Sequence, residues 1–432
     1  MGDLRQVSQV KILEKDNNTK IYKLNMNTYG TNFNLCHMYY VFRKGSEQMS
    51  YDKKLVYLDY GASTPMNKEV FKEIEPYFYT FYGNPSSVSS FSEQSKMAIF
   101  NARERIAKAI NCKRNEIYFT SGGTESDNWA IKGAALKNRD KGNHIITTAI
   151  EHPAVLNTCK YLEELGFKIT YLPVDKYGIV DLESIRNAIT ENTILVSIMF
   201  ANNEIGSIQP IGEMGKLCRE QGVIFHTDAV QAAGHIPIDV EEMNIDMLSM
   251  SAHKFYGPKG IGILYIKRGI KIDGFIHGGH QERGRRAGTE NTPGIVGIGK
   301  AIELCTAKMS EESDRIKKLR DKLAEGILEI TGTELNGPDY DRRLPGNLNI
   351  CFNGIEAEIL LMSLDLKGIC ASAGSACSAG SIRPSHVLSA IGLSPEKCKS
   401  SIRFSIGEET SEEDIDYTIS TLKEIISSIR TT

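Results

Sequence analysis

The stretch MLSMSAHKFYGPKG, residues 247–260, places an apolar run directly before two reactive side chains and a turn-forming segment. Met247–Ser251 has the length and composition of a buried strand. His253 and Lys254 follow it closely, and the next six residues contain two glycines and a proline. A lysine is ordinarily a solvated surface residue. A lysine held in a shaped pocket can instead lose its proton and form a Schiff base.

Similar apolar runs recur on both sides of this stretch and alternate with amphipathic segments such as Ser92–Ile110. Short apolar strands that alternate with helices are typical of a mainly parallel sheet covered on both faces. The sequence therefore predicts an α/β fold with a mainly parallel seven-stranded sheet in a large domain, residues 55–305. The predicted strands are Glu116–Thr120, His144–Ala149, Lys168–Leu172, Thr193–Phe200, Val223–Thr227, Met247–Ser251 and Gly262–Lys267.

The chain changes character after about Cys305. We expect residues 306–432 to form a smaller α+β domain. Its predicted helices are Glu311–Ile330, which is highly charged, Glu356–Leu364, and a last helix from about Glu412 to Arg430. Its predicted strands are Asn347–Phe352 and Ser401–Ser405.

Residues 1–54 differ from the rest, being rich in Asn, Lys and Tyr with only short alternating stretches. A mitochondrial presequence is Arg-rich and poor in acids, which the residues Asp3, Glu14 and Asp16 argue against. We expect a flexible N-terminal extension, and Met49 is an alternative start of the protein.

The composition is that of an ordinary globular protein, with 41% hydrophobic and 24% charged residues among 432. A net charge of −3 suggests no general attraction to nucleic acids or membranes. The nine cysteines form no paired framework, which favours reduced thiols in a cytosolic protein. We expect a cytoplasmic protein with no membrane span, no direct nucleic-acid partner and no metal of its own, since His277 and His280 lack further ligands in a recognisable spacing.

Polar side chains follow five of the predicted strands, where each strand ends. Ligands of open parallel sheets bind beyond the carboxyl ends of the strands, so these groups should meet at one edge. In chain order they are Ser121 to Ser126, then Glu151 and His152, then Asn202 to Glu204, then Asp228 and Gln231, and finally His253 and Lys254.

Each group also has an ordinary structural interpretation. Ser121–Thr124 could be a plain strand-to-helix turn, or its glycines could let backbone N–H groups approach a phosphate at a helix N-terminus. It is not a Walker loop, because no Gly-Lys-Ser/Thr follows. Asp228 could be a helix N-cap, and His152 a loop residue before a helix that begins at Pro153.

Cys377 lies in the stretch CASAGSACSAGS, residues 370–381, where nearly every side chain is small. This stretch could be a flexible loop with an incidental thiol, or a mobile arm that carries a nucleophile. The second thiol, Cys370, means that composition alone does not select the reactive cysteine.

With these residues in place, the chain from about Val56 to about Ser428 resembles the NifS/IscS-type cysteine desulfurases, in the class V aminotransferase branch of fold-type I pyridoxal-phosphate enzymes. The resemblance rests on Leu58–Pro65, Gly83–Ser87, Thr120–Asn128, Glu151–His152, Asn202–Gly206, His226–Gln231, Ser251–Gly260, Gly284–Thr289, Gly374–Cys377 and Ser401–Ser405. A class V aminotransferase or a selenocysteine lyase is the nearest alternative, and a catalytically silent assembly partner that binds the cofactor is another.

The resemblance implies pyridoxal 5′-phosphate as the cofactor. Lys254 would form the Schiff base, and Asp228 would pair with the pyridine nitrogen. His152 would stack on the ring and move protons. The other cofactor-binding residues would be Gln231 at the phenolic oxygen, Asn203 near cofactor and substrate, Gly123, Thr124, Ser251 and His253 at the phosphate, and Thr289 at the cofactor of the other subunit.

The resemblance also implies the reaction. Arg403 would clamp the carboxylate of L-cysteine, and Cys377 would take the sulfur as a persulfide while L-alanine leaves. A homodimer is expected, with an iron–sulfur scaffold protein or a tRNA-thiolation enzyme as sulfur acceptor. The only metal contact expected is between the Cys377 persulfide and a nascent cluster on such a partner.

Overall fold

The computed structural model describes residues 7–16, 19–26, 37–43, 55–374 and 384–431. The chain divides into two compact units, residues 1–54 and residues 55–432. In the first unit the strands β1 (Val7–Asp16), β2 (Thr19–Met26) and β3 (His37–Arg43) form an antiparallel sheet in that order. The flexibility expected of residues 1–54 stays a prediction.

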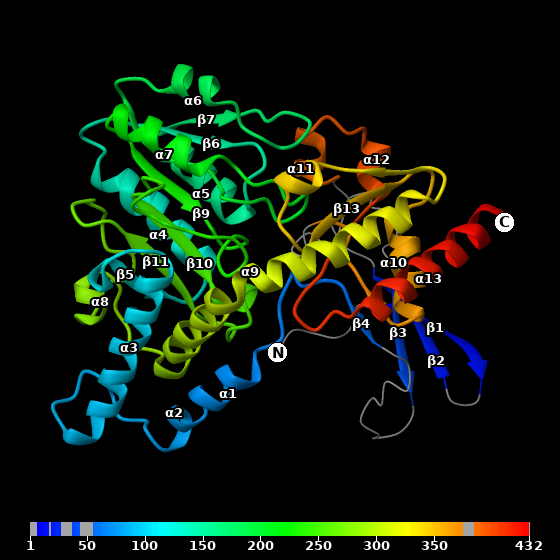
Figure 1. Cartoon of the computed structure of the whole chain (residues 1–432), viewed down its shortest axis with the longest axis horizontal. Coiled ribbons are helices and arrows are strands. Elements are labelled where there is room, and N and C mark those ends of the chain that lie inside the picture. Colours follow the sequence, from blue (N-terminus) through cyan, green and yellow to red (C-terminus); the bar gives the residue numbers. More distant parts are fainter. Residues whose placement is uncertain (1–6, 17–18, 27–36, 44–54, 375–383, 432) are drawn as a thin grey trace. The chain divides into compact units, whose positions relative to one another are not determined.

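A seven-stranded sheet lies at the centre of the second unit (Figure 1). Six strands run in one direction, and β11 runs against both of its neighbours. The predicted mainly parallel sheet is therefore confirmed. In spatial order its strands are β5 (Ile117–Thr120), β11 (Gly262–Ile266), β10 (Met247–Ser251), β9 (Ile224–Asp228), β8 (Thr193–Ser197), β6 (His144–Thr148) and β7 (Lys168–Leu172).

Neighbouring residues of the central strands enter two different hydrophobic cores, because successive side chains point to opposite faces of a sheet. Ile145 packs with α4 (Gly123–Lys137) and α5 (Pro153–Glu164), on one face. The next residue, Ile146, packs with α3 (Glu93–Ala109) and α7 (Ile211–Glu220), on the other. Burial on both faces explains why these strands are continuous apolar runs.

The helix α9 (Thr292–Leu328) is 37 residues long and contributes to two cores. Ile295 near its start belongs to a core of the large sheet, and Leu323 near its end belongs to the core of the smaller sheet. The predicted helix Glu311–Ile330 is therefore the second half of a longer helix. The proposed division between residues 305 and 306 falls inside it.

A second, three-stranded antiparallel sheet contains β12 (Thr333–Leu335), β13 (Asn347–Phe352) and β15 (Ser401–Ser405). Both strands predicted in this region are confirmed with their boundaries. A separate parallel pair joins β4 (Val56–Tyr57) to β14 (Ile369–Cys370). The remaining helices are α1 (Lys68–Ile74), α2 (Pro76–Tyr79), α6 (Leu182–Ala188), α8 (Gln281–Gly284), α10 (Ala357–Leu366), α11 (His386–Ala390), α12 (Pro395–Lys399) and α13 (Glu412–Thr431). Among the described residues, none of the helices combines the length and the apolar character needed to cross a bilayer.

Candidate active site

The Lys254 ammonium lies against a backbone segment from the start of the second unit. Its Nζ donates to the carbonyl oxygens of Gly61, at 2.6 Å, and Ala62, at 2.8 Å. Gln231 Nε2 donates to the same Gly61 oxygen at 3.0 Å. The segment Gly61–Ala62 therefore joins two of the predicted site residues, although no role was predicted for it.

His152 lies at the start of α5 and close to the charges of Asp228 and Lys254. Its Nδ1 accepts a hydrogen bond from the Ala154 backbone N–H at 3.1 Å, so a neutral ring carries its proton on Nε2. Burial lowers the pKa of His152; Asp228 opposes this shift, and Lys254 and His386 add to it. The imidazole is therefore biased toward the neutral form, which can accept a proton.

Asp228 ends β9 and is 5% exposed. One carboxylate oxygen accepts from the Val230 backbone N–H at 2.9 Å. A turn follows β9 and no helix begins there, so the N-cap interpretation of Asp228 is wrong. Burial raises the pKa of Asp228, while His152 and Lys254 lower it. A buried carboxylate that is stabilised by the nearby Lys254 ammonium is suited to pair with a protonated ring nitrogen.

A tightly packed turn precedes α4. A Cβ atom on Gly123 would lie 2.6 Å from Val230 Cγ2, and one on Gly262 would lie 2.6 Å from Gly122 Cα. Glycine at these positions therefore permits the close approach of neighbouring segments. The turn leads into the N-terminus of the 15-residue helix α4, whose first backbone N–H groups have no acceptor within the helix and can donate to a ligand.

Ser251 lies beside this turn, and His253 follows it by two residues in the chain. The Ser251 hydroxyl would be 3.8 Å from a Cβ on Gly122. Burial, with Lys254 and Lys259, lowers the pKa of His253 to about 4, so its ring is neutral near pH 7. A helix N-terminus, a hydroxyl and an imidazole form a donor set that fits a phosphate group.

Arg403 belongs to β15 and is 1% exposed. Its Nη2 lies 2.7 Å from Asp59 Oδ1, and its Nη1 donates to the Asn203 carbonyl oxygen at 3.0 Å. Its Nε is buried and has no hydrogen-bond partner among the described residues. A buried guanidinium with an unused donor is suited to a carboxylate ligand.

Cys377 lies outside the described residues, but both flanks of its segment meet at Glu204. The Ser385 hydroxyl donates to Glu204 Oε2 at 2.5 Å, and a Cβ on Gly374 would lie 3.0 Å from the same oxygen. Glu204 directly follows Asn203, which contacts Arg403. The segment that carries Cys377 therefore starts and ends beside the predicted carboxylate site.

Thr289 is exposed. Together with Ser121 and Arg286 it lines a cavity of about 260 Å³ beside the turn before α4. Its predicted reach into the site of another subunit stays untested.

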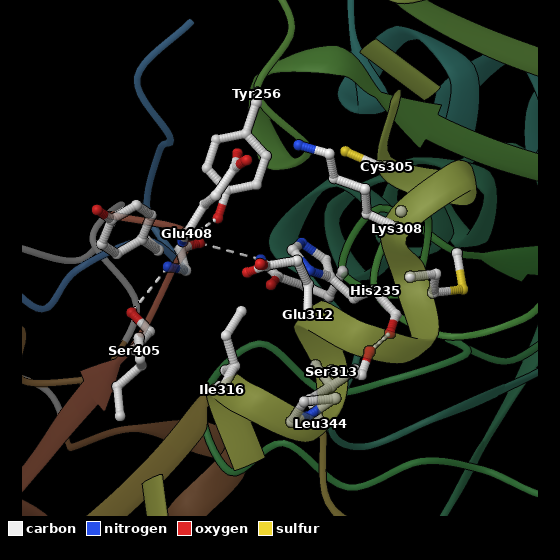
Figure 2. Close-up of a pocket in the computed structure, with 18 of the residues that line it drawn as sticks. His235, Tyr256, Cys305, Lys308, Glu312, Ser313, Ile316, Leu344, Ser405 and Glu408 are labelled. Atoms are coloured by element: carbon white, nitrogen blue, oxygen red, sulfur yellow. Dashed lines mark hydrogen bonds between the residues drawn. The ribbon is translucent and has the colours of Figure 1, made fainter. Parts of the chain in front are cut away.

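A further cavity of about 130 Å³ adjoins the site (Figure 2). Tyr256, Cys305 and Lys308 line it, and it shares Gly61 with the site. One of its lining residues, His235, has Nε2 2.9 Å from the Lys254 carbonyl oxygen. This cavity therefore backs onto the segment that carries Lys254.

Sequence reasoning missed several residues that shape the site. Asp59 and Gly61 belong to a string that was noted only for the family resemblance. His386 has its Nε2 2.9 Å from the Glu151 carbonyl oxygen. Asp127 lies within α4 next to the charge of Asp228. Neither His386 nor Asp127 follows an apolar run, so the strand-end pattern could not find them.

Comparisons with known proteins identify the family of the chain. The family model described as "Aminotransferase class-V" matches residues 56–418. A Clostridium botulinum protein named "Cysteine desulfurase IscS" is 59% identical over 375 residues, covering 86% of this chain and 94% of the relative. A Methanosarcina thermophila protein of the same name is 56% identical over 384 residues, covering 89% and 95%.

Two solved structures are similar over most of the chain. The one titled "NIFS-LIKE PROTEIN" has a TM-score of 0.82 at 39% identity and covers 87% of this chain and 100% of its own. The one titled "SspA in complex with cysteine" has a TM-score of 0.74 at 40% identity, covering 81% and 98%. The chain therefore belongs to the class-V aminotransferase family of pyridoxal-phosphate enzymes and, within it, to the cysteine desulfurases.

Proposed function

We propose that this protein removes sulfur from L-cysteine, releasing L-alanine and carrying the sulfur as a persulfide on Cys377. The observation that carries the proposal is the meeting of two cations from different sheets. Lys254 follows the large sheet, and Arg403 lies in the small one. Gly61 lies next to both, since its carbonyl oxygen accepts from Lys254 and a Cβ on it would lie 3.4 Å from the guanidinium carbon of Arg403.

The residues present fit pyridoxal 5′-phosphate. Lys254 would hold the cofactor covalently, and Asp228 would face its pyridine nitrogen. Gly123, Thr124, Ser251 and His253 would hold the phosphate, with Thr289 contributed by a second subunit. His152 and Asn203 would line the ring, and Gln231 would bond the phenolic oxygen. When bound, the cofactor withdraws electrons from the substrate's α-carbon.

The chain's own groups would perform the remaining tasks. Arg403 binds the substrate carboxylate through its unused Nε and holds the α-carbon near Lys254. The Lys254 amine takes the α-proton, and the neutral His152 accepts or returns a proton nearby. The Cys377 thiolate attacks the substrate sulfur, so an S–S bond forms, the C–S bond breaks, and the carbon skeleton is protonated and leaves as alanine.

Product analysis tests this function. Holoenzyme given L-cysteine and a reductant should release alanine and sulfide in equal amounts, and Lys254→Ala should release neither. Absence of alanine would refute the proposal. Alanine from selenocysteine only, with none from cysteine, would favour a selenocysteine lyase, and a keto acid formed together with a new amino acid would favour an aminotransferase.

We further propose a cytoplasmic homodimer that passes its persulfide to an iron–sulfur scaffold protein or a tRNA-thiolation enzyme. The exposed Thr289 beside the phosphate turn supports a site completed by a second subunit. A pull-down with protein pre-loaded by cysteine should capture the acceptor, and Cys377→Ser treated in the same way is the matched control. Equal capture by both proteins would contradict a persulfide-dependent partner, and sedimentation as a monomer would contradict the dimer.

A further inference from the structure

A buried polar cluster lies behind Asp228, on the face of the large sheet that α4 covers. In the strand register Ser249 lies opposite Asp228, and Ser197 lies opposite His226. His226 and Asp228 are two residues apart on β9, so they share this face. Asp127 of α4 completes the cluster.

Both ring nitrogens of the histidine in the cluster are hydrogen-bonded to hydroxyl groups. His226 Nδ1 lies 2.9 Å from Ser197 Oγ, and its Nε2 lies 3.0 Å from Ser249 Oγ. Burial lowers the pKa of His226 to about 3, so the ring is neutral. It therefore offers no positive charge to a neighbouring carboxylate.

Asp127 is 1% exposed, and no cation of the described residues is among the groups that act on its carboxyl. Its Oδ1 lies 3.8 Å from His226 Nε2 and has no hydrogen-bond partner in the described part of the chain. The Ser249 hydroxyl, which lies 3.0 Å from His226 Nε2, is a neighbouring group that lowers the pKa of Asp127. An ionised carboxylate would be destabilised here, because a single hydroxyl takes the place of the water and cations that normally stabilise the charge.

The groups that act on Asp127 all favour its protonated form, apart from that one hydroxyl. Burial raises the pKa of Asp127 well above its ordinary value, and the charge of Asp228 raises it further. Asp228 differs, since the Lys254 ammonium and the Val230 backbone N–H both stabilise its charge. Two neighbouring buried carboxyls do not both ionise readily, so the negative charge belongs on Asp228.

We propose that Asp127 is a positioning residue that remains a neutral carboxylic acid beside Ser249 and His226, and thereby keeps the single negative charge of the pair on Asp228. The inference rests on the proposed function, in which Asp228 faces the pyridine nitrogen. A proton on Asp127 leaves Asp228 ionised opposite that nitrogen, whereas a charge on Asp127 would compete with it.

Infrared difference spectra test the protonation directly. The holoenzyme at pH 7 should show a carboxylic-acid C=O stretching component that Asp127→Asn removes while keeping the side-chain shape. Glu151 is a second buried acid with a pKa of about 8, so Glu151→Gln should remove a separate component and serves as the matched control. An unchanged carboxylic-acid band in Asp127→Asn would overturn the inference.

A pH titration of the bound cofactor's visible absorbance tests the charge of the pair. Asp127→Asn exchanges one neutral group for another, so the titration midpoint should stay within a few tenths of a pH unit. Loss of a real negative charge would lower it by about one unit or more, which would also overturn the inference. Asp228→Asn should shift the midpoint; no shift there would instead refute the proposed role of Asp228, while the infrared result would still decide the state of Asp127.

Discussion

Replacing Arg403 with lysine separates substrate binding from the rest of the proposed reaction. The guanidinium is 1% exposed and uses two of its nitrogens within the protein, on Asp59 and on the Asn203 carbonyl oxygen. This leaves Nε for a ligand. A lysine at this position keeps the positive charge near Asp59. It loses the several N–H donors of the planar guanidinium, which can bond to the protein and to the substrate at the same time.

The expected loss follows from one charge-assisted hydrogen bond. Such a bond contributes about 1.5–3 kcal/mol, which corresponds to a roughly 10- to 150-fold weaker binding of cysteine. Arg403→Lys should therefore raise KM by this factor, with a smaller fall in kcat because the α-carbon is also held less well near Lys254. Alanine release measured over a range of cysteine concentrations gives both constants.

Two controls make this result specific. The cofactor's absorbance should be unchanged in Arg403→Lys, since no proposed cofactor contact is altered. Arg320→Lys removes another fully buried guanidinium, which is paired with Asp321 instead, and should leave KM unchanged. A fall in kcat at constant KM, or an equal rise in KM in both variants, would refute the role given to Arg403.

The remaining predictions concern the cofactor, the thiol and pH. Lys254→Ala should lose the visible absorbance of the bound cofactor. Lys259 is exposed, so the control variant Lys259→Ala should keep that absorbance. Cys377→Ala should keep the absorbance and give little sulfide, and the same behaviour in Cys370→Ala would mean that the wrong thiol was chosen. Gly123→Ala places a Cβ 2.6 Å from Val230 Cγ2 and should lower the free energy of unfolding by about 1–3 kcal/mol, as measured by urea unfolding. The double variant Gly123→Ala with Val230→Ala should regain most of that loss, because the clashing methyl group is removed. Burial raises the pKa of Glu151 from 4.5 to about 8, so the native state binds more protons than the unfolded chain between these values. The free energy of unfolding should therefore fall as pH rises from about 5 to 8. Urea titrations at several pH values should show this dependence flattened in Glu151→Gln, and an unchanged slope would contradict the prediction.

The strands of the large sheet could be predicted because each is a buried apolar run that ends in a polar group. β7 and β10 have the predicted boundaries. The prediction for β8 ran on to Phe200, whereas the strand ends at Ser197. The N–H of Phe200 still bonds to the Asp228 carbonyl oxygen, so the extra residues follow β9 without being part of the strand.

The first half of α9 could not be predicted, because its local composition disfavours a helix. Pro293, Gly294, Gly297 and Gly299 lie in its first turns, and glycine costs about 1 kcal/mol relative to alanine in a helix. Tertiary packing supplies the reason for one of them. A Cβ on Gly299 would lie 2.8 Å from Ala102 Cβ, so the glycine permits the close approach of α9 to α3.

The strand-end pattern predicted one wall of the site and missed the other. His152, Asp228 and Lys254 each follow a strand of one sheet, so their proximity follows from the parallel arrangement. The contact between Arg403 and Asp59 spans 344 residues and depends on how the small sheet meets the start of the second unit. A single sequence carries no local signal for such a contact.

The structure also bears on the choice between the two thiols in residues 370–381. Cys370 lies in β14, paired with β4, and burial raises the pKa of its thiol, with Asp365 and Asp59 adding to the shift. A raised pKa lowers the thiolate fraction near neutral pH, and a strand position fixes the sulfur in place. A persulfide carrier needs the opposite properties, because its sulfur must ionise and then reach an acceptor. The surroundings of Cys370 therefore argue against it as the nucleophile and leave Cys377, between the flanks held at Glu204, as the better candidate.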